Sequence, residues 1–238
     1  MTRDQRFAFF HRRDADTDEP PSWLRSTLML LWDNLATLTL LNLVASLIAA
    51  PFLLLAMAMG VLPMLVAAVI AFPLILGGLT AAVSGEWRGL PGTMRERFVQ
   101  TIRSRWLALL PLGVIAAVCA TSSIITTSLV LAGADRWLLF LWLAQCGFLV
   151  LAVMLLLYAV PLVAAHDLSP RLALRNALVL TIAAPLPTLG IFALLVLLAV
   201  LQAWIGLGLW LIVPVIGAVF MATNCEHQIE RLQQVTNQ

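Results

Sequence analysis

Two groups of titratable side chains stand where long apolar segments end. His166 and Asp167 follow one segment, and Glu226, His227 and Glu230 follow another. Imidazole and carboxylate groups are common zinc ligands and general bases, so these groups are the first candidates for chemistry. No H-E-x-x-H, G-x-S-x-G or P-loop pattern accompanies them, and polar residues are expected wherever a helix leaves a bilayer. The sequence therefore predicts no enzyme, with no catalytic residue, no metal site and no cofactor.

Neutral polar side chains lie deeper within the apolar segments. Hydroxyl groups spaced four residues apart share one face of a helix, where they bond backbone carbonyls or a neighbouring helix. Such groups commonly hold helices together, and the alternative is a polar path for a neutral solute. The residues to which these two readings apply are Asn42, Ser46, Ser123, Thr127, Gln145 and Gln202.

The segments that must position these side chains are free of charge and of bilayer length. No Asp, Glu, Lys or Arg occurs in residues 34–85, 106–134, 137–165 and 176–225. A helix rises about 1.5 Å per residue and a hydrocarbon core is about 30 Å thick, so a span takes about 20 apolar residues. The outer two segments hold two spans each and the middle two hold one each. The missing mid-membrane charge argues against an ion-driven or proton-driven transporter.

Composition agrees with a membrane protein and disfavours other classes. Of the 238 residues, 62% are hydrophobic and 11% are charged, whereas soluble domains carry about 25% charged residues. A net charge of +2, without basic stretches interleaved with aromatic residues, argues against a nucleic-acid partner. Cys119, Cys146 and Cys225 show no C-x-x-C spacing, which indicates neither a disulfide framework nor a zinc site.

We predict an all-α fold, a polytopic membrane helical bundle with six transmembrane helices arranged as three hairpins. Residues 1–25 form a cytosolic, partly disordered tail, 26–225 the transmembrane domain, and 226–238 a cytosolic C-terminal tail. The predicted spans lie near 28–50, 61–83, 107–131, 138–162, 178–202 and 207–225.

The placement of arginine predicts the orientation of these spans. All 14 basic residues are arginine, and basic residues accumulate on the cytoplasmic side of short loops. With six spans and both termini in the cytosol, only Arg136 falls outside. Three spans in the first uncharged segment would instead divide the arginines almost evenly between the two sides. The sequence therefore predicts a multi-pass protein with both termini cytosolic.

The connector between the second and third predicted spans has a helical pattern of its own. Met94, Phe98, Ile102 and Trp106 recur every four residues among arginines, which predicts a cytosolic amphipathic helix in the membrane interface. Anionic lipid headgroups would attract it by about 1 kcal/mol per basic residue; in the alternative reading the arginines only fix the orientation of the loop. The expected lipid or partner contacts are Arg95, Arg97, Phe98, Arg103 and Arg105.

Several short stretches resemble the YesL-like family of bacterial integral membrane proteins. They are Leu41-Asn42, Phe72-Pro73, Gly77-Gly78, Ala81-Ala82, Phe98 and Arg175-Asn176-Ala177-Leu178. The resemblance implies a non-enzymatic protein of the bacterial cytoplasmic membrane that accompanies carbohydrate ABC importers. It further implies that the glycines and Pro73 serve as packing and kinking positions.

Two functions follow as expectations. The first is an accessory or scaffold component whose partners are the lipid bilayer, with its anionic headgroups, and another membrane protein or a second copy of the chain. The second is a small permease or channel for a neutral solute, which the polar side chains inside the spans would line. The sequence favours the first because mid-membrane charge is missing.

Overall fold

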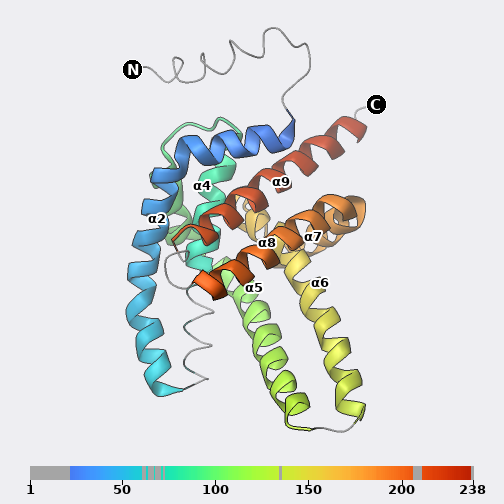
Figure 1. Ribbon diagram of the computed structural model, residues 1–238. Coiled ribbons are helices and arrows are strands. Elements are labelled where there is room, and N and C mark those ends of the chain that lie inside the picture. Colours follow the sequence, from blue (N-terminus) through green and yellow to red (C-terminus); the bar gives the residue numbers. More distant parts are fainter. Residues whose placement is uncertain are drawn as a thin grey trace.

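The computed structural model describes residues 22–60, 63, 67, 71, 73–133, 136–205 and 211–236, and no strand occurs among them. The predicted all-α class is therefore confirmed. The elements, shown in Figure 1, are α2 (Trp23–Met59), the π-helical turn η1 (Pro73–Gly77), α4 (Gly78–Trp87), α5 (Met94–Leu131), α6 (Arg136–His166), α7 (Pro170–Ala183), α8 (Pro185–Ile205) and α9 (Val213–Thr236).

Three of the described helices are long and apolar enough to cross a membrane. They are Trp23–Pro51 within α2, all of α5, and Trp137–His166 within α6. A fourth span results if the bent pair of α7 and Pro185–Leu201 is counted as one. These helices indicate a membrane-embedded protein.

The arrangement of six spans as three hairpins is not confirmed by the described residues. The predicted span 61–83 falls partly outside them, and its remainder forms η1 and most of α4. The span 207–225 begins outside them and continues as α9 to Thr236. The helices also reach into both predicted tails, because α2 begins at Trp23 and α9 runs past residue 226; residues 1–21 lie outside the described part of the chain.

The predicted span 178–202 is broken at Ala184, where α7 and α8 meet at 105°. Pro185 follows Ala184 directly, and a proline pushes the preceding residue out of the helical region. Ala184 accordingly has φ −131° and ψ 64°. The local sequence therefore explains why the helix stops, while the angle depends on what α7 packs against.

The predicted connector helix is present, but as the beginning of α5 and not as a separate element. Thr93 begins it with a capping box, in which its hydroxyl accepts from the Glu96 amide at 3.2 Å and Glu96 Oε2 accepts from the Thr93 amide at 2.9 Å. Met94 and Phe98 are buried. The Phe98 ring packs on Gly78 of α4, so the first part of the apolar face covers protein, whereas Trp106 at its end is 41% exposed.

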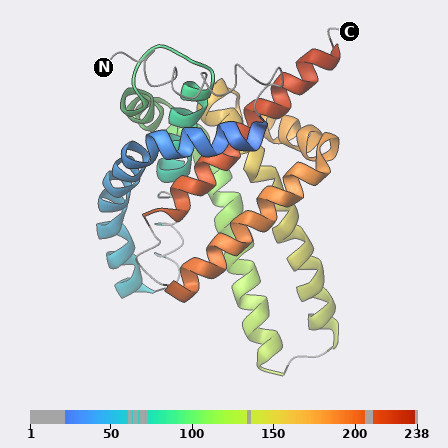
Figure 2. The same cartoon turned by 45° about the horizontal axis from the view of Figure 1, so that its top comes forward.

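Two helices form the centre of the described bundle. In α4, every residue from Gly78 to Gly85 is buried, and the first half of α9 is buried almost as completely. In Figures 1 and 2, α2 lies on one side of α4 and α9, and the long α5–α6 hairpin extends away from them. The centre is thus shielded by other helices.

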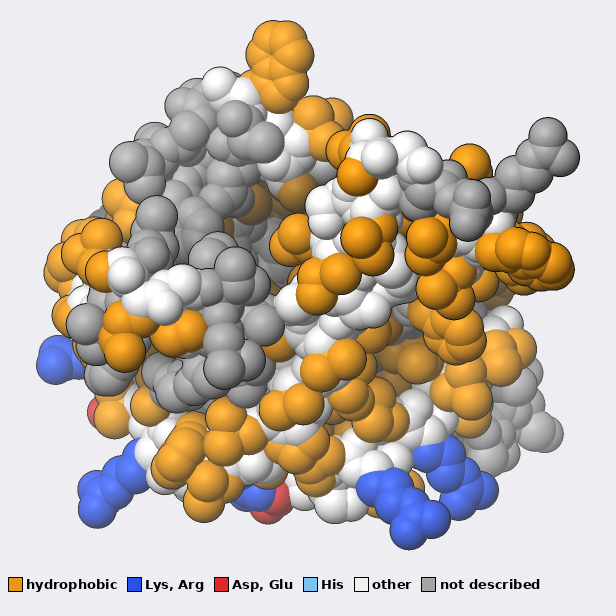
Figure 3. All heavy atoms as spheres, turned by 90° about the horizontal axis from the view of Figure 1, so that it is seen from below, with side chains coloured by type: hydrophobic (Ala, Val, Ile, Leu, Met, Phe, Trp, Pro, Cys, Tyr) orange, Lys and Arg blue, Asp and Glu red, His pale blue; other side chains and the backbone are white. Residues whose placement is uncertain are grey.

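Charge and apolar surface separate along the bundle. We call the end that holds Arg88, His166 and Glu226 the charged end; the beginning of α2 and the end of α9 lie there, opposite the α5–α6 turn (Figure 1). Seen from the side of that turn, apolar side chains cover most of the described surface and arginines lie at its edge (Figure 3). Trp204 is 88% exposed and Trp137 83%, which suits a lipid environment.

Candidate functional site

A buried carboxylate joins three elements at the charged end. Glu226 of α9 is 3% exposed, and its Oε1 lies 2.9 Å from His166 Nε2 and 3.5 Å from Arg88 Nε. Arg88 Nη2 also donates to the Ala165 carbonyl at 3.0 Å. These contacts compensate for the loss of water around the carboxylate. We call Arg88, His166 and Glu226 the Glu226 cluster.

A second contact between α4 and α9 lies one helical turn further along α9. Trp87 Nε1 donates to Glu230 Oε1 at 3.1 Å. Residues four apart lie on one face of a helix, so Glu226 and Glu230 both face the end of α4, where Trp87 and Arg88 are neighbours. The pair of contacts fastens α9 to α4 at two points.

Arg97 is used inside the protein and not at its surface. Its Nη1 lies 3.4 Å from Glu86 Oε2, and its guanidinium donates to the Gly92 carbonyl at 2.8 Å. It also donates to the carbonyls of Ala82 and Leu90. Arg97 therefore closes the loop between α4 and α5.

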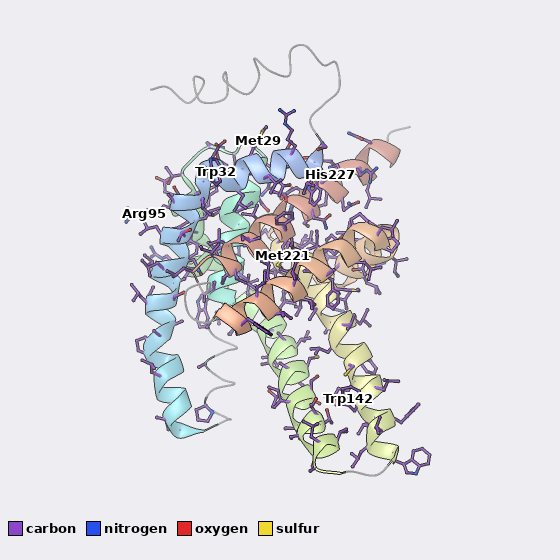
Figure 4. The ribbon with its side chains drawn as sticks, viewed as in Figure 1. Met29, Trp32, Arg95, Trp142, Met221 and His227 are labelled. Atoms are coloured by element: carbon purple, nitrogen blue, oxygen red, sulfur yellow. The ribbon has the colours of Figure 1, made fainter. Side chains whose placement is uncertain are left out.

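The other predicted contact arginines divide into two kinds. Arg105 forms an ion pair with Asp167 and ties α5 to the loop between α6 and α7. Arg95 and Arg103 are exposed, and neither has a hydrogen bond or ion pair within the described part of the chain. Figure 4 shows Arg95 at the outer edge of the bundle. Of the residues predicted to contact lipid or a partner, Arg95 and Arg103 remain available.

A chain of buried hydrogen bonds runs from α9 through α6 to α8. Gln228 Nε2 lies 3.5 Å from Asn224 Oδ1, and Asn224 Nδ2 donates to Tyr158 Oη at 2.9 Å. Tyr158 Oη lies 2.8 Å from Thr188 Oγ1, which donates to the Ala184 carbonyl at 2.7 Å. Because the Thr188 proton points to Ala184, the Tyr158 hydroxyl donates to Thr188. This Tyr158 chain ends at the break between α7 and α8.

Of the predicted polar residues of α2, Asn42 contacts the chain just before α9. Asn42 is fully buried, and its Nδ2 donates to the Leu211 carbonyl at 2.8 Å. The Ser46 hydroxyl is also buried, and the described residues offer it no hydrogen-bond partner. Asn42 thus satisfies a carbonyl just before α9, where the helix begins.

The predicted polar residues of α5 and α6 meet one another across the hairpin. Gln145 Oε1 accepts from Thr126 at 2.9 Å, and Gln145 Nε2 donates to Ser122. Trp142 Nε1 donates to Thr127 Oγ1 at 2.9 Å. Thr127 in turn donates to the carbonyl of Ser123 at 2.7 Å, while the Ser123 hydroxyl finds no partner among the described residues. We call Ser122, Thr126, Thr127, Trp142 and Gln145 the hairpin cluster.

The structure does not bring the predicted polar residues of α2 together with those of the α5–α6 hairpin. Asn42 and the hairpin cluster share no hydrogen bond in the described residues, and both views place α2 apart from the lower part of the hairpin (Figures 1 and 2). Figure 4 likewise shows Trp142 low in the hairpin and His227 at the charged end. The side chain of Gln202 lies outside the described residues.

Metal chemistry gains no support from the described side chains. Among them, no group of three or more His, Cys, Asp and Glu could hold a metal ion. In the Glu226 cluster the carboxylate forms an ion pair with the Arg88 guanidinium and a hydrogen bond with the His166 imidazole. No family model, curated protein or solved structure matches this chain. Its function is therefore inferred from its own contacts.

His227 neighbours the Glu226 cluster but faces α2. Its ring stacks on Trp23 with centroids 6.1 Å apart. Burial lowers the pKa of His227 below its ordinary value, the positive charge of Arg231 lowers it further, and Glu230 opposes both effects. The imidazole is therefore neutral at pH 7 and acts as an aromatic packing group between α2 and α9.

Sequence reasoning missed Arg88, Tyr158, Thr188 and Asn224 as members of these clusters. The sequence feature that could have indicated the cluster residues of α9 is the polar run from Thr223 to Gln228 at the end of an apolar segment. Such a run is also expected where a helix simply enters water. Asn224 and Gln228, four residues apart, share a helix face, but the sequence does not reveal that this face is covered.

Proposed function

We propose that this chain is a multi-pass protein of the bacterial cytoplasmic membrane, with its charged end in the cytosol, and that it acts as a non-enzymatic accessory or scaffold component. This proposal rests on the hydrogen bonds that the interior polar groups form. The Tyr158 chain and the hairpin cluster bond to neighbours within the protein, in separate places. Such bonds hold helices together and leave those groups engaged with each other.

The exposed side of the beginning of α5 is the surface that we assign to a partner. Arg95, Val99 and Arg103 are spaced four residues apart and are all exposed, so they form one face. This α5 face combines an apolar side chain with two guanidinium groups that have no ion pair to any described residue, as an acidic amphipathic segment of another protein would require. The YesL-like resemblance supports a carbohydrate ABC importer as the partner.

The test is co-purification from the native membrane in a mild detergent. We expect a membrane protein to be recovered with the wild-type chain and to be reduced at least fivefold by Arg95→Glu with Arg103→Glu. Arg171→Glu with Arg175→Glu on α7, a matched charge reversal, is expected to retain the partner. Recovery of the wild-type chain without a protein partner, together with transport by the pure protein, would overturn the proposal.

A permease or channel for a neutral solute is the second candidate. It is favoured by the helix irregularities, since η1 is π-helical and the α7–α8 pair is bent by 105°, and such breaks occur at functional sites of transporters. Solute flux into liposomes that falls at least tenfold with Asn42→Leu and Gln202→Leu would support this function. Flux that is unchanged by these substitutions counts against it.

A further inference from the structure

An open groove of about 770 Å³ lies at the charged end between the end of α6, α7 and the end of α9. Its walls are largely aliphatic, with Leu162, Val179 and Leu232 from the three helices, and His166, Asn176 and Gln233 add polar groups. We call it the α7 groove. An aliphatic groove with a few polar groups at the surface suits a ligand with an apolar body and a polar end.

Two arginines of α7 are aligned along the helix with a residue of one groove wall. Arg171, Arg175 and Val179 follow each other at intervals of four residues, so the two arginines continue the face of α7 to which Val179 belongs. Both arginines are exposed and have no hydrogen bond or ion pair to any described residue. Among the described acids, Asp167 pairs with Arg105, and Glu226 pairs with Arg88 and forms a hydrogen bond with His166.

The surface of α7 changes from polar to apolar along its length. It begins with the exposed arginines and ends near Ile182, which is 70% exposed, before the chain turns by 105° into the apolar α8. Val179, in the groove wall, is itself 55% exposed. This order of side chains matches a passage from lipid headgroups to the hydrocarbon core.

We propose that the α7 groove binds an anionic phospholipid. The phosphate bonds to Arg171 and Arg175, whose planar guanidinium groups suit phosphate oxygens, and an acyl chain lies against the aliphatic wall that Val179 contributes to. The positive charge of these two arginines, which no described acid neutralises, selects an anionic headgroup over a zwitterionic one. This site does not depend on the accessory role proposed above.

The test uses the full chain in mild detergent, an equimolar mixture of dioleoyl phosphatidylglycerol and dioleoyl phosphatidylcholine, and native mass spectrometry to count bound lipids. We expect the wild-type chain to retain phosphatidylglycerol in preference to phosphatidylcholine. Because each basic residue near an anionic surface changes binding roughly fivefold, Arg171→Gln with Arg175→Gln is expected to reduce this preference about 25-fold. Val179→Trp, which fills the apolar part, is expected to reduce retention of both lipids.

The comparison pair is Arg95→Gln with Arg103→Gln, which removes two arginines of the α5 face proposed above for a protein partner and is expected to reduce the preference much less than the α7 pair does. The α7 substitutions are at exposed positions, so far-UV circular dichroism should show unchanged helix content. Equal loss with the α5 pair would show general surface attraction and overturn the site. An unchanged preference after Arg171→Gln with Arg175→Gln would also overturn it, and would leave the groove to a partner helix.

Discussion

Glu226 illustrates how an ionised side chain is kept inside a largely apolar protein. Its carboxylate is 4% exposed, while the Arg88 side chain that faces it is 30% exposed. The arginine therefore keeps part of its hydration, and the carboxylate gains a hydrogen bond from His166 as well. Such a contact adds little net stability compared with apolar packing, yet removing one partner leaves the others without compensation.

We expect Glu226→Gln to lower the free energy of unfolding by about 1–3 kcal/mol, because the buried amide no longer neutralises Arg88. Asp33→Asn, which removes a carboxylate from the exposed side of α2, is expected to change it by less than about 0.5 kcal/mol. Unfolding in detergent, followed by far-UV circular dichroism, measures both. Equal changes in the free energy of unfolding would show that the Glu226 cluster contributes no more to stability than an exposed carboxylate does.

Helices α4 and α5 approach each other through glycines. A Cβ atom placed on Gly78 would lie 2.6 Å from Phe98 Cε2, and one on Gly85 would lie 2.4 Å from Arg97 Cδ. These glycines are seven residues apart, so they lie on one face of α4. A Cβ on Gly77, just before α4, would lie 2.4 Å from Leu109 Cδ1 of the same partner helix. Small residues therefore set the distance between the two helices, as is common in membrane proteins.

Gly78→Ala is expected to lower the stability by about 1–2 kcal/mol, because the buried Phe98 ring has to move and this overpacking exceeds the gain in helix propensity. Gly147→Ala on α6 is the matched control, since a Cβ there meets nothing within 4 Å. It should raise the stability by up to about 1 kcal/mol. Unfolding in detergent measures the stability of both variants. A gain in stability in both would contradict the close packing of Gly78 against Phe98.

Taken as a whole, the molecule has buried polar side chains and an exposed apolar surface. Thr223, Asn224, Glu226 and Gln228 of α9 are all buried, while large apolar side chains of α5, α6 and α8 are exposed. A bilayer makes this arrangement favourable, because the apolar surface faces lipid and the polar groups pair within the protein. The charged end and the α5–α6 turn then lie on opposite sides of the membrane.

Thiol labelling of intact cells measures this orientation, after Cys119, Cys146 and Cys225 have been replaced by alanine. We expect an impermeant maleimide to label Trp137→Cys, next to the α5–α6 turn, from outside. Arg103→Cys should be labelled only after permeabilisation if the charged end lies in the cytosol, as we propose. The reverse pattern would contradict the orientation, and labelling of both from one side would contradict a hairpin that crosses the membrane.

The sequence by itself predicted the membrane class, the apolar spans within α2, α5 and α6, and the helical start near Met94. These features depend on local properties: the length of uncharged segments, the spacing of Met94 and Phe98, and the capping residue Thr93. Pro185 and Pro187, which follow Ala184, are a local reason for the break in a span that was predicted as continuous over 178–202.

Only the tertiary structure decided which apolar faces meet protein and which meet lipid. Phe98 was expected at the membrane surface but packs on Gly78, and α9, predicted only as the last of six spans, is buried along much of its length. Hydropathy cannot make this distinction, because lipid tails and leucine side chains are equally apolar. The partners of Glu226 and Tyr158 follow from the same packing, since they come from helices distant in sequence.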